Sequence, residues 1–469
     1  MSLAIDPNGE RILSDALVTT LKDLLGERFS TAQSVREHHG TGEAYHTAAL
    51  PEGVAFASST EEVAAIVKAC AAHHTPVIPY GTGTALEGHT LALHGGVSLD
   101  VSGMDEIIRV SAEDMDCTVQ AGVTRNTLNE YLRDTGLFFP VDPGADASLG
   151  GMAATRASGT TTVRYGAMRE NVLALTVVLA DGRIIQTARR ARKSSAGYDL
   201  TRLFVGSEGT LGVITEVTLR LYGIPEATRA AVCSFPDLEA AVNTVISVVQ
   251  CGIPIARCEL LDKTGMKMIC DYGKLDEYTI GDTLFMEFHG SEAGVTEQAE
   301  QVQAIAADFG AGDFKWASKL EDRNKLWAAR HNGHYAILAT AKPGQHTMST
   351  DVCVPVSRLA ECIMATQEDL AQTGLVSPFV GHAGDGNFHM AILANYGDPD
   401  EDRLAHDFHD RLVKRAQAME GTCTGEHGVG SGKIDYLEAE LGEAVDVMRS
   451  VKRALDPDNI MNPGKMLRL

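Results

Sequence analysis

The sequence predicts an α+β protein of two domains, and its length and a change of pattern along the chain are the main indications. Its 469 residues exceed the size at which a single hydrophobic core usually stops growing. Before residue 222, short β-rich runs alternate with helical patterns; after residue 225, longer helices lie between strands of antiparallel character. We therefore place the boundary at residues 222–225, with a first domain at 1–224 (core about 45–224) and a second at 225–469.

Helices of the amino-terminal half are indicated by local signals. Ser59 and Glu62 have the spacing of a capping box at the start of a helix. One apolar face of that helix consists of Val63, Ile66, Val67 and Cys70. A second helix is predicted to begin at Thr124 and to bury Leu128, Tyr131 and Leu132.

Strands are predicted in both halves. In the first half they are the runs 77–78, 96–101, 107–110 and 116–121, followed by 175–180 and 182–187, which Asp181-Gly182 joins as a hairpin. In the second half, helices at 237–250 and 321–340 lie among strands at 229–235, 283–289 and 350–355. The whole pattern fits sheets that are covered by helices.

Composition excludes several classes of function. Lys+Arg 40 against Asp+Glu 63 gives a net charge of −23, which argues against nucleic acid or an anionic membrane as a partner. The nine cysteines contain no C-x-x-C pair, which indicates thiols rather than a disulfide framework. No basic stretch followed by an apolar run begins the chain, and the longest apolar run, 172–180, is too short for a membrane span. We expect a cytoplasmic protein with no transmembrane segment.

Two glycine-rich blocks, at 81–88 and 140–166, are candidates for cofactor binding. The first does not have the spacing of a dinucleotide-binding Rossmann turn, and G-V-G-S-G-K at 428–433 does not have that of a Walker loop. Such a block alone is more often a tight loop. Together they leave many hydroxyls and backbone amides without side-chain bulk around them. An extended cofactor with a pyrophosphate link would provide partners for such groups.

Both blocks, and G-S-E-G-T-L-G-V-I-T at 206–215, resemble the FAD-binding motifs of the vanillyl-alcohol oxidase and p-cresol methylhydroxylase superfamily. L-W-A-A-R-H-N at 326–332, S-T-D-V-C-V-P at 349–355 and M-N-P-G-K at 461–465 resemble FAD-linked oxidases of D-2-hydroxy acids, with cytochrome-linked D-lactate dehydrogenases as the nearest pattern. The resemblance implies non-covalent FAD, a ferredoxin-like second domain, and a tail (about 456–469) that returns to the flavin. The implied FAD-binding residues are Gly81, Thr82, Gly83, Thr84, Pro143, Gly144, Ser148, Gly150, Gly151, Thr155, Gly159, Thr160, Ile214 and Asn462.

The stretch V-G-H-A-G-D-G-N-F-H-M at 380–390 places two histidines on either side of a glycine-containing turn. The turn changes the strand parity and can bring His382 and His389 to one face. Taken by itself, this pair is better explained as two histidines of the core that form hydrogen bonds. G-T-C-T-G-E-H-G-V-G at 421–430 adds a carboxylate and a third imidazole, so we assign His382, His389 and Glu426 to one divalent metal and His427 to a general base. The resemblance implies Zn²⁺ or Mn²⁺, and the ligand set leaves Fe²⁺ as a third candidate.

Arg330 is the candidate for binding the substrate carboxylate, because a guanidinium can hold a carboxylate with two hydrogen bonds. From the residues alone, Arg330 is better explained as a surface arginine on an amphipathic helix. The resemblance reverses this preference in favour of substrate binding. His334 lies one helical turn further and is the other predicted substrate-binding residue, beside His427.

These assignments predict FAD- and metal-dependent oxidation of a small D-2-hydroxy acid, with D-lactate first, to the 2-oxo acid. A D-2-hydroxyglutarate dehydrogenase or a glycolate oxidase subunit is the nearest alternative, and a flavin-free metal-dependent hydrolase or a non-catalytic flavoprotein subunit is the alternative from another class. Cytochrome c, an electron-transfer flavoprotein and a quinone are all candidate electron acceptors. A homodimer is one of the oligomeric states that the sequence leaves open.

Substrate size has its own indication. In the resembling hydroxyglutarate enzymes, a lysine lies just ahead of the aspartate of the S-T-D-V-C-V-P segment, and here Ser349 takes its place. Lys342 is close in sequence but lies in A-K-P-G-Q, which is typical of a loop. A second carboxylate in a closed pocket needs a cation, so a monocarboxylate substrate is expected.

Overall fold

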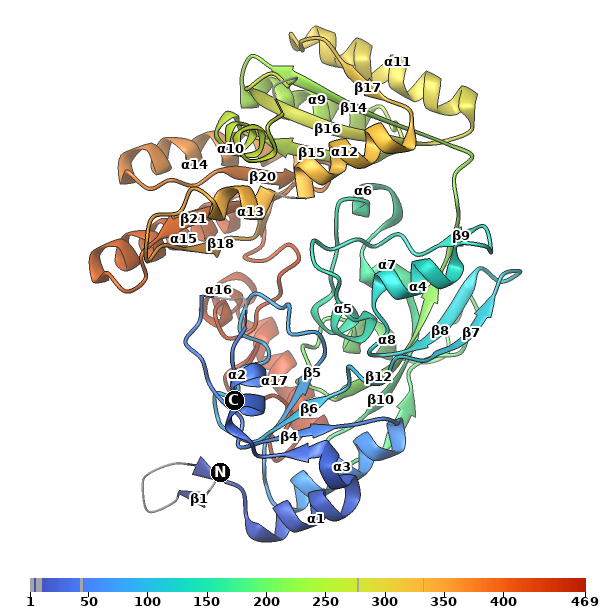
Figure 1. Ribbon diagram of the computed structural model, residues 1–469, viewed down its shortest axis with the longest axis vertical. Coiled ribbons are helices and arrows are strands. Elements are labelled where there is room, and N and C mark those ends of the chain that lie inside the picture. Colours follow the sequence, from blue (N-terminus) through green and yellow to red (C-terminus); the bar gives the residue numbers. More distant parts are fainter. Residues whose placement is uncertain (1–3, 6–10, 43–44, 276–277, 332) are drawn as a thin grey trace. The chain divides into compact units, whose positions relative to one another are not determined.

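The computed structural model describes residues 4–5, 11–42, 45–275, 278–331 and 333–469 (Figure 1). The chain forms two compact units. Unit 1 consists of Met1–Ser158, Gly166–Ile224 and Glu426–Leu469, and unit 2 consists of Gly159–Tyr165 and Pro225–Gly425. The larger segment of unit 2 begins at Pro225, and its short segment Gly159–Tyr165 lies within the predicted first domain. The chain is back in unit 1 from Glu426 onward, 30 residues before the tail for which the return was expected.

Unit 1 contains two larger sheets. The first is mixed and has the order β3–β4–β6–β5, in which β4, β6 and β5 are parallel and β3 is antiparallel to β4. Its strands are β3 (Phe29–Ser30), β4 (Gly53–Phe56), β6 (Val97–Asp100) and β5 (Val77–Tyr80). The second is antiparallel, in the order β11 (Ile184–Gln186), β10 (Val172–Val178), β12 (Val213–Arg220), β8 (Asp116–Gln120) and β7 (Ile107–Ser111). Two antiparallel pairs complete the strands: β1 (Ala4–Ile5) with β2 (Arg11–Ile12), and β9 (Leu137–Phe138) with β13 (Tyr222–Gly223).

Short helices accompany these sheets. They are α1 (Asp15–Leu25), η1 (Gly26–Arg28), α2 (Gln33–Gly40), α3 (Thr60–Ala72), α4 (Arg125–Leu132), α5 (Leu149–Thr155), α7 (Met168–Asn171), α8 (Leu200–Phe204), α16 (Ile434–Leu441) and α17 (Glu443–Leu455). α3 begins where predicted, and the Ser59 hydroxyl accepts a hydrogen bond from the Glu62 N–H at 3.2 Å. The reciprocal half of the capping box is absent there, because the Glu62 carboxylate accepts from the Ser58 N–H and from Arg28 instead.

The predicted apolar faces are largely correct. Val63, Ile66, Val67 and Cys70 of α3 are fully buried in the core between the first sheet and α1. Leu128 and Leu132 of α4 are also buried, but Tyr131 is 60% exposed and was predicted wrongly. The reason is that an eight-residue helix buries only a narrow stripe, and Leu128 and Leu132 already occupy it. The Asp181-Gly182 hairpin is confirmed, with Val178 opposite Ile184.

The main sheet of unit 2 has the order β17–β14–β16–β15–β20–β21–β18, with β19 paired to β21, and all its pairs are antiparallel. The strands are β14 (Ala227–Phe235), β15 (Ile255–Leu261), β16 (Asp282–Gly290), β17 (Lys315–Ala317), β18 (His346–Ser349), β19 (Val352–Cys353), β20 (Phe379–His382) and β21 (Asn387–Ala394). The helices are α6 (Thr162–Tyr165), α9 (Leu238–Gln250), α10 (Lys263–Gly273), α11 (Glu292–Asp308), α12 (Leu320–His331), α13 (Gly333–Leu338), η2 (Val356–Arg358), α14 (Leu359–Thr373), η3 (Ala383–Asp385) and α15 (Pro399–Ala418).

The chain order β14–α9–β15, β16–α11–β17 and the spatial order β17–β14–β16–β15 are those of a ferredoxin-like βαββαβ core, with α10 inserted between β15 and β16. This confirms the predicted α+β class. α9 contacts β14, β15 and β16 and also α11 and α14, as Figure 1 shows for α9 and α11. The other face packs Met266 of α10 and Trp327 of α12 against Leu261 and Phe285. The single helix predicted at 321–340 is present as α12 and α13, and residue 332 between them lies outside the described residues.

None of the helices described in this structure is both long enough and apolar enough to cross a membrane.

Candidate active site

In unit 1, β5 leads directly into the first glycine-rich loop. Gly81 has no room for a side chain, because a Cβ there would lie 2.5 Å from the Ser148 Oγ atom. Gly83 has a φ of +74°, in the left-handed region that favours glycine. The Ser148 N–H donates to Thr82 Oγ1 at 3.4 Å, and the Thr82 and Thr84 hydroxyls are also 3.4 Å apart. The two glycine-rich blocks therefore meet at this loop.

The second block continues into α5. A Cβ at Gly150 would lie 2.5 Å from the Ala121 Cβ, so this helix can pack against the end of β8 only with glycine here. A Cβ at Gly151 would lie 3.0 Å from the Ser148 Oγ, and the Thr155 hydroxyl donates to the Gly151 carbonyl at 3.2 Å. Ahead of the helix, Pro143 is half-buried and Gly144 is exposed. The block thus gives a backbone surface with little side-chain bulk.

Two buried polar atoms of unit 1 test whether these residues fit FAD. The Ser148 Oγ and the Asn462 Oδ1 are buried and have no hydrogen-bond partner among the residues that the structure describes. Asn462 is fixed at its other end, because its Nδ2 donates to the carbonyls of His89 and Glu208 at 3.1 and 2.8 Å. Its own N–H bonds to the Val77 carbonyl on β5 at 2.8 Å. Buried polar atoms without partners are costly, and the phosphate and ring atoms of FAD could supply partners. The residues fit the cofactor.

The other predicted FAD-binding residues lie elsewhere. Gly159 and Thr160 belong to the segment Gly159–Tyr165 of unit 2, whose helix α6 contacts β15. Ile214 is buried on β12 of unit 1, opposite Val177 on β10. Contact of these three residues with FAD stays a prediction.

In unit 2, ionisable side chains form a stripe across one face of the main sheet. Residues directly opposite each other on antiparallel strands point to the same face, and so do residues two apart on one strand. Glu259 lies opposite His382, Arg257 lies opposite Glu287, and His389 lies opposite Val380, two residues from His382. All five side chains therefore share one face, and Glu259 and Glu287 are almost completely buried there. Burying such charges costs stability unless each one has a hydrogen-bond or ion-pair partner.

The two histidines of the stripe come together as predicted. η3 and Gly386, which has a φ of +78°, make the turn between β20 and β21. The rings of His382 and His389 lie 5.5 Å apart between centroids, at an angle of 82°. His382 Nδ1 bonds to Glu259 Oε1 at 2.7 Å, and His389 Nδ1 bonds to the Thr350 carbonyl at 2.9 Å.

Both of those partners only accept hydrogen bonds, so in each neutral ring Nδ1 carries the proton and Nε2 carries the lone pair. This is the tautomer in which histidine binds metals through Nε2, with the other nitrogen held by an oxygen acceptor. The chemistry of this donor pair fits a divalent metal.

Glu259 also binds Arg330, which is predicted to bind the substrate carboxylate. Its Oε2 accepts a hydrogen bond from an Arg330 terminal nitrogen at 2.7 Å, so one carboxylate joins α12 to His382. Burial raises the pKa of Glu259, but the neighbouring His382 and Arg330 outweigh burial and lower it to about 2. Glu259 is therefore a carboxylate throughout the neutral range. The side chain of His334, the second predicted substrate residue on these helices, lies outside the described residues.

The loop with Glu426 and His427 opens the last segment of unit 1, one peptide bond after Gly425 of unit 2. The Ser158 hydroxyl donates to Glu426 Oε2 at 2.5 Å. Glu208 holds the following residues, because its carboxylate accepts from the N–H groups of Val429 and Gly430 at 2.7 and 2.8 Å.

Further buried charges support this loop. Glu208 lies 3.3 Å from His89 Nε2, and a Cβ at Gly428 would come within 2.7 Å of the Glu208 carboxylate. Lys433 lies 2.9 Å from Glu87, whose backbone carbonyl accepts from the Ser431 N–H. Burial raises the pKa of Glu87, but Lys433 and the neighbouring histidines outweigh it and lower the pKa to about 2. The buried charged groups of Glu208, Glu87 and Lys433 therefore fix the position of the loop.

Sequence reasoning missed Glu259, Glu208 and Glu87. The one signal for Glu259 is that it and Arg257 are charges inside the otherwise apolar strand I-A-R-C-E-L-L at 255–261, since buried charges must find partners. Glu208 lies within the G-S-E-G-T motif, but the motif predicts no separate role for its carboxylate. Their partners are distant in the sequence, so no local pattern identifies them.

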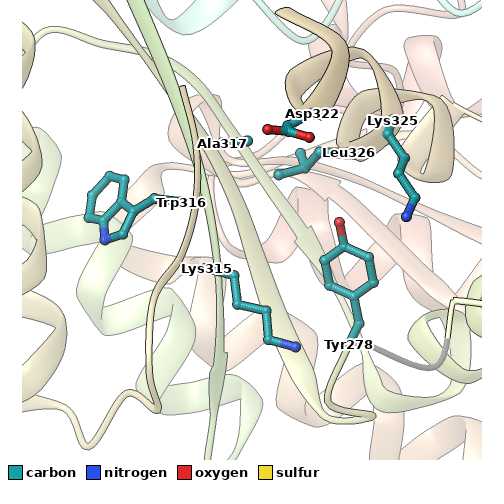
Figure 2. Close-up of a pocket in the computed structure, with 7 residues that line it drawn as sticks. All are labelled: Tyr278, Lys315, Trp316, Ala317, Asp322, Lys325 and Leu326. Atoms are coloured by element: carbon teal, nitrogen blue, oxygen red, sulfur yellow. The ribbon is translucent and has the colours of Figure 1, made fainter. Parts of the chain in front are cut away.

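Unit 2 also has a cavity of about 150 Å³ at β17 and the start of α12 (Figure 2). Its lining consists of Tyr278, Lys315, Trp316, Ala317, Asp322, Lys325 and Leu326. Lys315 and Trp316 are neighbours on β17 and point to opposite sides of the strand in Figure 2. The Lys315 ammonium lies 5.3 Å from the centre of the Tyr278 ring. Because this lining includes none of the predicted site residues, we place the candidate active site at His382, His389 and Arg330, which Glu259 helps to hold.

Comparisons with known proteins agree with this picture. Residues 224–466 match the model of the FAD-linked oxidases, C-terminal domain, and residues 51–188 match an FAD binding domain. The solved structure of p-cresol methylhydroxylase with substrate bound has a TM-score of 0.81 at 18% identity, over 99% of this chain and 98% of that one. That likeness confirms the predicted fold.

The predicted cytoplasmic location is wrong. Similar proteins from Danio rerio and Arabidopsis thaliana are named mitochondrial. The nine cysteines are free, but free thiols do not distinguish the cytoplasm from another reducing compartment. The criterion of an apolar leader concerns only secretory signals, because mitochondrial transit peptides are amphipathic and rich in arginine.

Relatives with curated names define the family. A protein of Danio rerio named probable D-lactate dehydrogenase, mitochondrial, is 51% identical over 97% of this chain and 92% of its own length. The D-lactate dehydrogenase [cytochrome], mitochondrial, of Arabidopsis thaliana is 46% identical over 96% of this chain and 80% of its own length. The chain therefore belongs to the family of FAD-linked oxidases that includes these dehydrogenases.

Proposed function

We propose that this protein oxidises D-lactate, and other small D-2-hydroxy acids, to the corresponding 2-oxo acids with FAD and one divalent metal. The observation that carries the proposal is the histidine stripe, in which His382 lies beside His389 and is joined through Glu259 to Arg330. Family membership and the names of the relatives point to the same chemistry.

The proposed metal ligands are His382, His389 and Glu426, with Zn²⁺ or Mn²⁺ as the first candidates and Fe²⁺ as the third. Two imidazoles and a carboxylate leave coordination positions for a substrate. A bound divalent metal acts as a Lewis acid that lowers the pKa of the substrate hydroxyl.

Arg330 is proposed to bind the substrate carboxylate. It is 13% exposed, and its Nε is buried without a hydrogen-bond partner among the described residues. A guanidinium fork suits a carboxylate, and fixing that end of the substrate orients the α-carbon.

His427 is proposed to take the proton of the α-hydroxyl. An α-hydroxyl is a weak acid, and hydride leaves its carbon readily only as this proton departs; an imidazole is well suited to accept it. FAD supplies the hydride acceptor when it is bound. The residues from Gly81 to Thr84 and around Ser148, with their backbone N–H groups and hydroxyls, are proposed to hold its pyrophosphate.

Cytochrome c is the electron acceptor that we favour over an electron-transfer flavoprotein or a quinone. The name of the Arabidopsis relative supports this choice. The net charge of −23 suits a basic protein partner, because complementary charges speed encounter. Electron transfer to cytochrome c should therefore slow as salt is added.

Anaerobic bleaching of the flavin tests the proposal. D-lactate should bleach the flavin band within seconds, whereas L-lactate and chelator-treated enzyme should not. The chelator should leave the flavin bound, because the FAD residues fit the cofactor without a metal. A preparation with no flavin spectrum would support the flavin-free hydrolase. Faster bleaching by glycolate would support a glycolate oxidase subunit, and faster bleaching by D-2-hydroxyglutarate would support a D-2-hydroxyglutarate dehydrogenase. Bleaching at the full rate by a preparation that elemental analysis shows to be metal-free would disprove the metal's role.

A further inference from the structure

Glu259 connects two parts of the proposed site that have different ligands. Its side chain is 1% exposed, with Oε1 at 2.7 Å from His382 Nδ1 and Oε2 at 2.7 Å from Arg330. We propose that Glu259 is a positioning residue that fixes both side chains at once and thereby couples the affinity for metal to the affinity for hydroxy acid. This inference rests on the proposed function, in which His382 binds metal and Arg330 binds the substrate carboxylate.

The effect on the metal follows from the tautomer of His382. A carboxylate can only accept, so it keeps the proton on Nδ1 and the lone pair on Nε2, and it makes the imidazole a stronger ligand. The sheet also fixes the distance, because Glu259 and His382 are directly opposite each other on β15 and β20. Loss of such a partner typically weakens metal binding 10- to 100-fold.

The effect on the substrate follows from the guanidinium of Arg330. Glu259 takes one of its terminal nitrogens, which sets the direction of the fork. The Arg330 Nε is buried and has no hydrogen-bond partner within the part of the chain that the structure describes. A buried donor of this kind indicates a ligand oxygen, and its aim depends on the bond to Glu259.

Glutamine cannot replace Glu259 in both roles. Its amide has one accepting oxygen and one donating NH₂. If the oxygen faces Arg330, the NH₂ faces His382 and forces the proton onto Nε2, where a metal would bind. If the oxygen faces His382, the NH₂ opposes the guanidinium, and Arg330 loses its partner. One of the two functions must suffer.

A matched control lies on the neighbouring strand. Glu287 is similarly buried on the same face and accepts from the Trp327 indole N–H at 2.6 Å. Its second oxygen lies 2.9 Å from His289. Glu287→Gln removes a buried charge from the same sheet without touching His382 or Arg330.

The experiment compares full-length, flavin-loaded wild type, Glu259→Gln and Glu287→Gln. Three quantities are measured: the dissociation constant of Zn²⁺ by chelator competition, KM and kcat for D-lactate, and the thermal midpoint with flavin content. Glu259→Gln should weaken Zn²⁺ binding at least tenfold or raise KM at least tenfold, while Glu287→Gln changes both less than about twofold. Values within twofold of wild type for Glu259→Gln, or equal changes in both variants, would overturn the inference.

Two further variants separate the possible outcomes. If Glu259→Gln does not yield flavin-loaded protein, Glu259→Asp replaces it under the same criteria, because its shorter side chain keeps the charge but cannot reach both partners. His382→Ala tests the proposed metal site itself. Zn²⁺ retained in His382→Ala would refute that site, whereas Zn²⁺ lost in His382→Ala and unaffected in Glu259→Gln would refute only the role of Glu259.

Discussion

Replacing Glu208 by glutamine tests how the loop that carries Glu426 and His427 is held. The Glu208 side chain is buried, and its carboxylate accepts hydrogen bonds from the N–H groups of Val429 and Gly430. Glutamine has the same size but offers only one accepting oxygen. One of the two backbone N–H groups would then face the amide NH₂, and the loop would lose half of its anchor.

The magnitude follows from these two bonds. A hydrogen bond to a charged acceptor is worth roughly 1.5–3 kcal/mol, and an N–H left buried without a partner costs roughly 1–3 kcal/mol. We take about 3 kcal/mol as the free energy by which Glu208→Gln destabilises the loop conformation that Glu208 holds. At about 1.4 kcal/mol for each factor of ten, the correctly seated population falls by up to a hundredfold. We therefore expect kcat for D-lactate to fall roughly 10- to 100-fold in Glu208→Gln.

The pH dependence of this effect has a definite sign. Burial raises the pKa of Glu208, but His89 and the backbone N–H groups of the loop outweigh burial and hold the pKa below its ordinary value. A carboxylate with a lowered folded pKa contributes its full stabilisation above the unfolded value of about 4.3 and loses it as pH falls through the folded value. The deficit of Glu208→Gln should therefore be constant above about pH 5 and shrink only below it.

The assay is kcat in flavin-loaded protein, with metal content measured in parallel. Asp456→Asn is the matched control, since Asp456 is equally buried in unit 1 and accepts from the N–H groups of Ile460 and Met461 at 3.0 and 2.8 Å. It should lower the thermal midpoint and leave kcat within about threefold when flavin is saturating. A kcat of Glu208→Gln within twofold of wild type, or an equal loss in Asp456→Asn, would refute the reasoning.

Three other predictions use separate measurements. Glu62→Gln removes a two-bond pair with Arg28 (2.6 Å each) that lowers the pKa of Glu62 to about 2; it should cost roughly 1 kcal/mol in urea unfolding above about pH 5, and progressively less as pH falls through about 2. His427→Ala should lose roughly 10²- to 10⁴-fold in kcat and keep its metal, whereas His382→Ala should lose both; metal kept in both would end that division of roles. With Ser349 in place of a cation, kcat/KM for D-2-hydroxyglutarate should be more than tenfold below that for D-lactate; equal values would refute a monocarboxylate pocket.

The features that the sequence predicts well are those with local causes. The pairing of His382 and His389 needs only a turn that changes strand parity, and Gly386 with its positive φ provides the turn. The hairpin at 181–182 and the start of α3 at Ser59 likewise depend on a few adjacent residues. Such features follow from backbone preferences that act over one or two turns of chain.

The missed features depend on distant pairing. Glu259 meets His382 across 123 residues and Arg330 across 71, and Glu208 meets Val429 across 221. Each contact requires the register of a sheet or the packing of a loop, which no window of sequence contains.

The arrangement of unit 2 suggests which parts of the site can change its substrate. His382, His389 and Glu259 stand on adjacent antiparallel strands, where backbone hydrogen bonds fix their spacing. Arg330 comes from α12 and is held to them by Glu259, while Ser349 is at the end of β18, opposite Ala391 and so on the same face as His389. Lys342, the nearest cation in sequence to Ser349, is exposed. A change at β15, β20 or β21 would disturb the proposed metal site, and a change at α12 would disturb Arg330, but a change at β18 would alter only what surrounds the substrate. We therefore expect a new specificity for a second carboxylate to arise at position 349, because a cation there would share the face of the proposed metal ligands without replacing any of them.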